Sequence, residues 1–316
     1  GDRRAVRRFG FRRRGASGRA SERRVGRRRR ETMGMITEGA LQAYLAFART
    51  LAEEAGALIR ERLLQLEAGE ALQIGTKSGP SDLVTEVDRA VEAHVVRRIR
   101  AAYPDHGVLG EEGTDAAGSP EAAGLRWVID PIDGTTNFVH QKVNFCVSIA
   151  LYAGDEGLVG VVYDPMREER FTAVRGGGAA LNGRPLRLNG AKGLSESLIG
   201  TSLTWVRRAR QTGLVEPVWR LAERSRGLRS LGAAALEAAY VAAGRLDAFL
   251  SLTLSPWDFA AAKLIVEEAG GTVVDFAGRP VGLKRPELGF LAAHPSLVGP
   301  ILEVLRPWVR SQQEVS

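Results

Sequence analysis

Cysteine, histidine and long apolar runs are all scarce in this sequence of 316 residues. Its one cysteine, Cys146, lies in an apolar stretch, so we expect a buried structural thiol and no internal disulfide, which fits a reducing cytoplasm. The four histidines have no ligand-like spacing, which argues against a histidine-rich zinc site. No apolar run reaches the roughly 18 residues that a membrane span needs, so we expect no membrane partner.

Acidic residues are nearly absent from the start of the chain, where the first 30 residues hold 14 arginines against only Asp2 and Glu22. This stretch carries a charge of +12, and because the total is +7 the rest carries −5. We expect residues 1–34 to form a disordered Arg-rich tail. Such a tail could bind nucleic acid, act as a transit segment, or be translated sequence upstream of a natural start at Met33 or Met35. We favour the last interpretation, because the periodic sequence begins just after it.

Apolar periodicity divides the rest of the chain into two predicted domains. Residues 35–194 form an N-terminal α+β domain, with helices at 38–66 and 87–99, a loop at 72–81, and strands at 125–130, 145–152, 158–163 and 170–174. The pair Asn182-Gly183 adds a hairpin signal. Residues 195–316 form a C-terminal α/β domain, in which helices at 215–226, 233–243, 259–269 and 296–309 alternate with strands at 246–250, 272–276 and 288–293.

The most informative stretch is residues 127–138, which read WVIDPIDGTTNF. Pro131 fixes its own φ and favours an extended Asp130, so that Asp130 and Asp133 can leave a strand end toward one point. Two hard oxygen ligands beside a turn suit Mg²⁺. The backbone N–H groups of residues 134–136 would lie at a turn or helix start, where anions bind readily. An ordinary turn rich in aspartate, proline and glycine is the alternative for this stretch taken alone.

Three further segments place acids beside apolar elements, and each has an ordinary structural explanation. Glu111 and Glu112 follow a short apolar strand and would form a solvated turn. Asp88 stands three residues after Thr85, a capping-box pattern before an apolar helical face. Asp258 follows Ser-Pro-Trp at a helix start, where an acid complements the helix dipole.

Together these segments resemble the inositol monophosphatase family of metal-dependent phosphatases. The matching motifs are W-x-x-D-P-[IL]-D-G-T-x-N-F at 127–138, D-x-V-T-x-x-D at 82–88, G-E-E at 110–112, and W-D-x-A followed by E-x-G-G from residue 257. The resemblance covers about residues 38–310. It implies a layered α-β-α-β-α sandwich of the inositol monophosphatase and fructose-1,6-bisphosphatase type, mixing α+β and α/β features, in a homodimer that lithium inhibits.

The resemblance also implies roles for individual residues. The ligands of two to three Mg²⁺ ions would be Glu111, Asp130, Asp133, Asp258 and the backbone carbonyl of Ile132. The catalytic residues would be Glu111, Thr135 and Asp88, with Asp88 orienting Thr135. The substrate would contact Gly134, Thr135, Thr136, Ala234, Ser251 and Lys77. Two positions depart from the pattern: Ala233 replaces a hydroxyl residue, and Ser251 replaces an acid that grips inositol.

We therefore expect Mg²⁺-dependent hydrolysis of a small phosphate monoester by a metal-activated water. Inositol 1-phosphate is the first candidate, although Ser251 loses a charge-assisted contact to it. Histidinol phosphate, fructose bisphosphate, NADP and adenosine bisphosphate are the alternatives. Nucleic-acid binding through the tail is a distant alternative. A silent scaffold is disfavoured, because it would not need to hold four mutually repelling carboxylates together.

Overall fold

A computed structural model describes residues 36–77, 83–113, 124–190, 192–202, 210, 212–284 and 286–315. The Arg-rich tail and Asp82 lie outside the described residues. No helix in the described part of the chain combines the length and the apolarity that a bilayer crossing requires.

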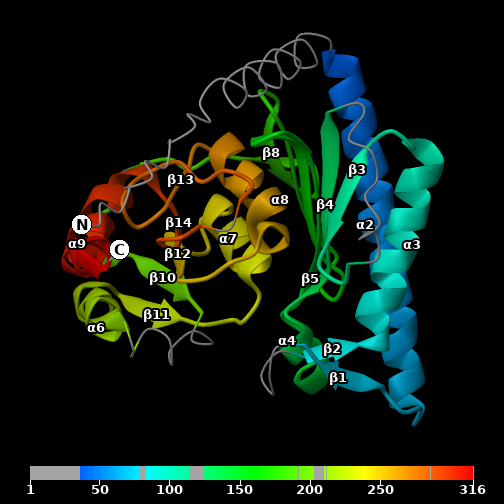
Figure 1. Ribbon diagram of the computed structural model, residues 1–316, viewed down its shortest axis with the longest axis horizontal. Coiled ribbons are helices and arrows are strands. Elements are labelled where there is room, and N and C mark those ends of the chain that lie inside the picture. Colours follow the sequence, from blue (N-terminus) through cyan, green and yellow to red (C-terminus); the bar gives the residue numbers. More distant parts are fainter. Residues whose placement is uncertain are drawn as a thin grey trace, which may run out of the picture.

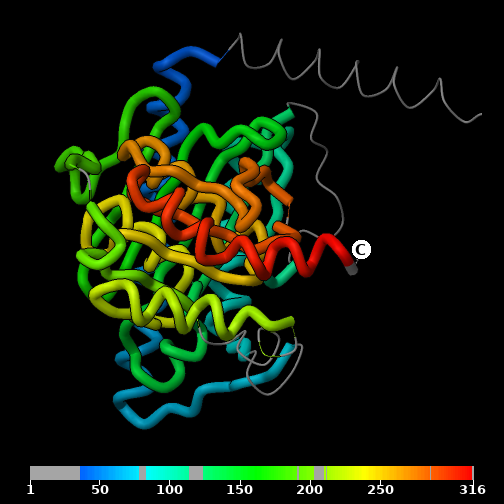
Figure 2. The backbone as a smooth tube through the Cα atoms, turned by 90° about the vertical axis from the view of Figure 1, so that its left-hand side faces the viewer, coloured from blue at the N-terminus to red at the C-terminus, as the bar shows by residue number. Residues whose placement is uncertain are grey.

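Helices and sheets alternate in five layers (Figure 1). One outer layer holds α2 (Glu38–Glu67) and α3 (Glu86–Ala102), the middle layer holds α7 (Ala234–Ala242) and α8 (Pro256–Glu268), and the other outer layer holds α6 (Val215–Arg224) and α9 (Pro295–Val315). In Figure 2, α6 and α9 run side by side across the face nearest the viewer. The α-β-α-β-α sandwich implied by the resemblance is confirmed.

The first sheet has seven strands in the order β3-β4-β5-β6-β7-β8-β9. Their bounds are β3 (Gly107–Gly110), β4 (Leu125–Asp133), β5 (Cys146–Ala153), β6 (Glu156–Asp164), β7 (Glu169–Val174), β8 (Gly178–Leu181) and β9 (Arg184–Leu186). Only the β3–β4 pairing is parallel within this sheet. The predicted Asn182-Gly183 hairpin joins β8 to β9, and both residues have the positive φ that such a turn requires.

The second sheet has five strands in the order β11-β10-β12-β14-β13. They are β10 (Leu198–Thr201), β11 (Gly227–Arg229), β12 (Ala248–Ser251), β13 (Thr272–Val274) and β14 (Phe290–Ala293), preceded by the short 3₁₀ helix η1 (Leu194–Glu196). β10, β11 and β12 are mutually parallel, so their carboxyl ends meet at one edge. The division into domains at residues 35–194 and 195–316 stays a prediction.

Two sequence predictions were wrong in short segments, and one short strand was missed. The predicted loop at 72–81 contains β1 (Ile74–Thr76), which pairs with β2 (Leu83–Thr85). The helix predicted at 215–226 ends at Arg224, and β11 follows it. The strand β10 was not predicted. Elements of three or four residues are too short to show a period, and the pairing partner fixes them.

The middle helix α8 lies very close to the first sheet. A Cβ atom on Gly160 of β6 would lie 2.8 Å from the carbonyl oxygen of Ala261, so only glycine fits there. Ala260, Ala261 and Ala262 are all buried between the layers. Small residues on both sides therefore let α8, which begins two residues before Asp258, rest directly on the sheet.

Acidification is expected to destabilise the fold through His106, which is buried in an aromatic cluster. Its Nδ1 accepts a hydrogen bond of 3.1 Å from Trp127 Nε1, and its ring stacks on Tyr103 at 4.8 Å. Burial lowers the pKa of His106, although Asp105 opposes this. The unfolded chain then binds a proton on this histidine more readily than the folded chain does. The contribution of neutral His106 to the free energy of unfolding is therefore fully present above about pH 6.5 and is lost as the pH falls below it.

Urea unfolding at pH 7.5 and pH 5.5 checks this prediction. The His106→Gln variant should lose part of the pH dependence, whereas His140→Gln, at an exposed position, should keep all of it. An equal pH dependence in the wild type and the His106→Gln variant would contradict the prediction.

Candidate active site

Four of the predicted acids meet where β4 ends. Asp130 and Asp133 belong to the last residues of β4, and Glu111 directly follows β3, whose parallel pairing with β4 brings the two strand ends together. Asp258 comes from the first turn of α8. Burial is the main cause that raises the pKa of Asp130 well above its usual range, and the charges of Glu111, Asp133 and Asp258 raise it further. All four side chains therefore lie in one region of the fold, within electrostatic range of Asp130.

The end of β4 is irregular at the positions of its two buried acids. Pro131 has no N–H for the ladder, and the pairing with β5 shifts register between Asp130 and Asp133. Asp130 Oδ1 accepts the N–H of Ile132 at 3.1 Å. Asp133 Oδ2 accepts the N–H of Ala235 at 2.6 Å, so the start of α7 points at this carboxylate.

Electrostatics at Asp133 reflect two opposing influences. Burial raises its pKa to about 7 and the charge of Glu111 adds to this, whereas the N–H groups of Ala235 and Ala234 lower it. The Cys146 thiol lies 3.6 Å from Asp133 Oδ2 and is buried, as predicted for a structural cysteine. The two N–H groups therefore do not fully offset the cost of burying the Asp133 carboxylate in its ionised form.

Gly134 makes the turn from β4 into α4 (Thr135–His140). Its φ of 92° lies in the left-handed region, and a Cβ atom there would come within 3.1 Å of Ala233 Cβ and of Asn144 O. Only glycine can adopt this turn at such close range without strain. The N–H groups of residues 134–136 accordingly lie at a helix start, as the sequence predicts.

Thr135 contacts Asp88 across the site. Thr135 Oγ1 lies 2.9 Å from Asp88 Oδ1 and 3.1 Å from the carbonyl oxygen of Ile132, so its one proton has two acceptors. Asp88 Oδ2 accepts the N–H of Thr85 at 2.8 Å and Thr85 Oγ1 accepts the N–H of Asp88 at 3.4 Å, which is the predicted capping box of α3. The Thr85 hydroxyl also donates to Asp88 Oδ2. Burial raises the pKa of Asp88, and the hydrogen bonds from Thr85 and Thr135 oppose this. One carboxylate thus serves as helix cap and as partner of Thr135.

Lys77 forms ion pairs with both acids of the Gly-Glu-Glu turn. Its Nζ lies 2.8 Å from Glu111 Oε1 and 2.5 Å from Glu112 Oε1. Burial alone would lower the pKa of Lys77, but the two carboxylates outweigh it and raise the pKa. The side chain is therefore an ammonium ion at the predicted site, and not an ordinary loop lysine.

Glu92 supports the same turn from below and was missed in the sequence. It is fully buried in α3, and it accepts the N–H of Glu112 at 2.8 Å. A Cβ atom on Gly110 would lie 2.5 Å from its carboxylate carbon, which explains the glycine of this motif. The available signal was its position, four residues after Asp88 on the buried face of the helix.

The remaining predicted contacts come from three different elements. Ala234 is the first residue of α7, Thr136 is exposed on α4, and Ser251 ends β12. Ser251 is 1 % exposed, and its hydroxyl donates to the carbonyl oxygen of Thr253. At the same sheet edge, the buried hydroxyl of Thr201 has no hydrogen-bond partner among the described residues, a polar position that the sequence did not reveal.

The acids fit a hard divalent cation by their chemistry, because they are oxygen donors with an excess of negative charge. Within the described residues, no three histidine, cysteine, aspartate or glutamate side chains already converge as a complete ligand set. The Glu111 carboxylate is paired with the Lys77 ammonium. One oxygen of Asp133 accepts the N–H of Ala235, and one oxygen of Asp258 accepts the N–H of Ser255. A cation at Glu111 would take the place of the Lys77 ammonium.

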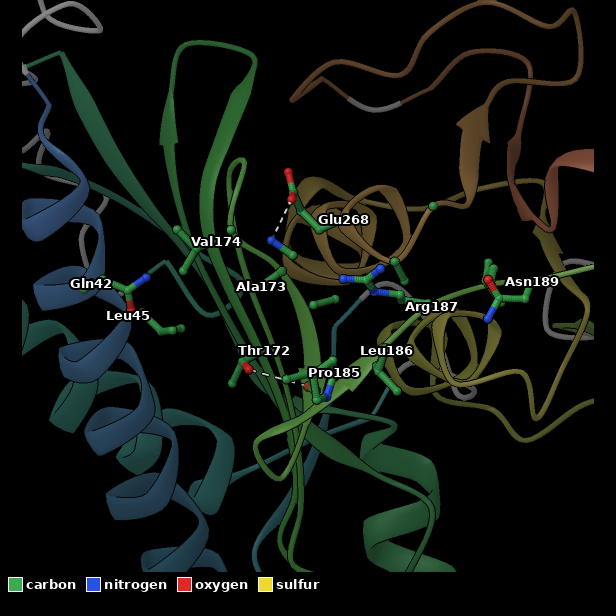
Figure 3. Close-up of a pocket in the computed structure, with 17 residues that line it drawn as sticks. Gln42, Leu45, Thr172, Ala173, Val174, Pro185, Leu186, Arg187, Asn189 and Glu268 are labelled. Atoms are coloured by element: carbon green, nitrogen blue, oxygen red, sulfur yellow. Dashed lines mark hydrogen bonds between the residues drawn. The ribbon is translucent and has the colours of Figure 1, made fainter.

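A hollow of about 570 Å³ lies elsewhere, at the opposite end of α8 (Figure 3). Gln42 and Leu45 line it from α2, and Arg187 and Glu268 line its other side. Glu268 stands ten residues after Asp258 in α8, which separates the two positions by roughly 15 Å along the helix. None of the predicted site residues lines this hollow, so it does not belong to the candidate active site.

Comparison with known proteins places this arrangement in a family. The family model described as the inositol monophosphatase family matches residues 40–307. The chain belongs to the inositol monophosphatase family. This family member is accordingly a phosphatase, as the resemblance of its motifs implies.

Three relatives illustrate the similarity. Nus factor SuhB of Pseudomonas aeruginosa is 42% identical over 271 residues, which are 84% of this chain and 97% of that protein. Inositol-1-monophosphatase of Bacillus subtilis (strain 168) is 41% identical over 260 residues, which are 81% of this chain and 94% of that protein. The solved structure of inositol monophosphate-bound SaIMPase-II has a TM-score of 0.72 at 32% identity, covering 86% of this chain and 100% of that chain.

Proposed function

We propose that this inositol monophosphatase family member hydrolyses a small phosphate monoester with Mg²⁺, and that inositol 1-phosphate is its preferred substrate. The observation that carries the proposal is the meeting of Glu111, Asp130, Asp133 and Asp258 opposite the start of α7. The name of the B. subtilis relative and the ligand bound to SaIMPase-II support the choice of substrate.

In this proposal the four acids and the Ile132 carbonyl would hold two to three Mg²⁺ ions. When bound, these ions would supply positive charge against the phosphate and activation of a water. Thr135 holds its proton toward Asp88 and offers its oxygen to the incoming water. Glu111, released from Lys77, accepts the proton of that water. The N–H groups of residues 134–136 bind phosphate oxygens, Ala234 touches the substrate near its phosphate, and Lys77 adds a positive charge beside them.

A phosphate-release screen with Mg²⁺ present or chelated tests the proposal. The substrates are inositol 1-phosphate, histidinol phosphate, fructose bisphosphate, NADP and adenosine bisphosphate. The highest kcat/KM is expected for inositol 1-phosphate, and chelation should stop release from all of them. Release that continues without Mg²⁺ would contradict the metal dependence, and a clear preference for another phosphate would reassign the substrate.

The residue at position 251 is expected to tune the choice of substrate. Ser251→Glu would restore a carboxylate that can accept hydrogen bonds from inositol hydroxyls, so kcat/KM for inositol 1-phosphate should change by about 10-fold relative to the other phosphates. Ser251→Gln is the matched control, because it adds the same length without charge. Equal changes on every substrate would place this residue in general support of the fold.

A second candidate function is that of a Nus factor, after which the P. aeruginosa relative is named. The 42% identity over nearly all of that protein favours it. The test replaces the relative in P. aeruginosa with this chain, in the wild-type form and as Asp133→Asn. Complementation by both forms would support a role that does not need hydrolysis, and failure of both would argue against this candidate.

The homodimer and the lithium inhibition implied by the resemblance stay predictions, and so does the cytoplasmic location expected from the single cysteine. Light scattering of the full chain checks the homodimer. A LiCl titration of the Mg²⁺-dependent activity checks the inhibition.

A further inference from the structure

Glu237 is a buried carboxylate behind the candidate active site that the mechanism above does not use. It lies in α7 with 0% exposure. Its two oxygens accept the N–H groups of Leu231 and Gly232, each at 3.2 Å, and the N–H of Ala233 also donates to it. Burial raises its pKa to about 7, and these three N–H groups oppose the rise. Within the described residues, no lysine or arginine forms an ion pair with it.

The loop that Glu237 holds, residues 231–235, is also fixed from the opposite side. Asn137 of α4 donates from Nδ2 to Leu231 O at 2.6 Å, and to Asn144 O at 2.7 Å. At its other end, Ala235 donates its N–H to Asp133 Oδ2 at 2.6 Å. The loop is thus clamped between a carboxylate below it and the β4–α4 turn in front of it.

The two sides of this clamp leave little room for the loop to shift. A Cβ atom on Gly232 would lie 3.2 Å from Asn137 Nδ2, and one on Gly134 would lie 3.3 Å from Gly232 O. The loop therefore closely contacts the segment from Gly134 to Asn137, which directly follows Asp133. A displacement of the loop would move the N–H groups at the start of α7 away from Asp133.

We propose that Glu237 is a positioning residue for the reaction, because it fixes the loop that leads directly into the N–H groups that orient Asp133. This inference rests on the proposed function. A carboxylate can accept several N–H groups at once, and hydrogen bonds to a charged acceptor are stronger than those to a neutral one. A glutamine would keep one good acceptor and turn its NH₂ group toward the loop, so at least one buried N–H would lose its partner.

The test compares Glu237→Gln with Asp275→Asn in the full chain. Asp275 is also buried, and it accepts the N–H groups of Ala277 and Arg279 at 2.9 Å each, just after the edge strand β13. The control therefore makes the same carboxylate-to-amide change at a backbone turn outside the candidate site. Both variants should lower the melting temperature, and Asp275→Asn also loses the ion pair between Asp275 Oδ2 and Arg279 Nε, which are 2.7 Å apart.

Two measurements test the inference, namely the Mg²⁺ affinity from calorimetry and kcat/KM from steady-state kinetics. For Glu237→Gln, the Kd for Mg²⁺ should rise about 10-fold or more and kcat/KM should fall by a similar factor, the usual effect of removing a partner that orients a metal ligand. Asp275→Asn should leave both values within about 2-fold of the wild type. Glu237→Asp, which keeps the charge, should regain part of the lost Mg²⁺ affinity.

Wild-type values of both quantities in Glu237→Gln would overturn the inference. If that variant does not fold, Asn137→Ser releases the loop from the other side and should weaken Mg²⁺ binding in the same way; unchanged binding would overturn the inference. A wild-type chain that neither binds Mg²⁺ nor releases phosphate would instead contradict the proposed function.

Discussion

The Asp133→Asn variant is expected to lose phosphate release altogether. Its Oδ atom can still accept the Ala235 N–H, so the local shape is kept while the negative charge is removed. A buried oxygen ligand without charge holds a divalent cation far less strongly. Phosphate release and Mg²⁺ calorimetry on the same preparation are the measurements, and Asp275→Asn is the control. Turnover at unchanged Mg²⁺ affinity would show that Asp133 is not a ligand.

The same variant should fold at least as stably as the wild type when no metal is present. Burial and the charge of Glu111 raise the pKa of Asp133 to about 7, which means that the fold disfavours its ionised form. Removing this charge relieves the repulsion, so the melting temperature in a chelator should not fall. Mg²⁺ should raise the melting temperature of the wild type and leave that of the variant unchanged. This comparison separates lost chemistry from lost structure.

Thr135→Ala is expected to lower kcat by about 10² or more, the usual range for a positioned proton transfer. The Thr135 hydroxyl lies between Asp88 and Ile132 O, and an alanine leaves no group there to orient the incoming water. Mg²⁺ affinity should remain within about 3-fold, because no proposed ligand side chain is removed. Steady-state kinetics and calorimetry give the two values.

The control for this prediction is Thr172→Ala on β7, where the hydroxyl faces the carbonyl oxygen of Ala180. It removes the same atoms from a strand outside the candidate site, and kcat should stay close to that of the wild type. A Thr135→Ala variant with the kcat of the control would show that Asp88 and Thr135 only cap and brace the turn.

Long periodic elements could be predicted from the sequence, because their own residues determine them. The helix expected at 38–66 is α2, which ends one residue later, and the capping box of Thr85 and Asp88 is present as expected. The last helix was expected to end at 309, but α9 continues to Val315. Its polar last residues carry no apolar period, which is why the end was misplaced.

The contacts between distant segments could be anticipated only by resemblance to a family. Nothing local to Asp88 indicates that Thr135, 47 residues later, lies 2.9 Å away. Glu92 and Glu237 were missed for a related reason. An acid on a helix usually faces water, and only the folded chain shows that backbone N–H groups of another loop meet these two.

The contrast between α8 and β3 has a consequence for how the site comes apart. Asp258 lies in the first turn of a helix that both sheets bury, whereas Glu111 follows a four-residue strand at the edge of the first sheet. Local opening costs less free energy at an edge strand than in a central helix. Amide hydrogen exchange should therefore be faster in β3 than at residues 260–262. Local opening at the end of β3 would therefore displace Glu111 from the site many times for each opening of the α8 turn that carries Asp258.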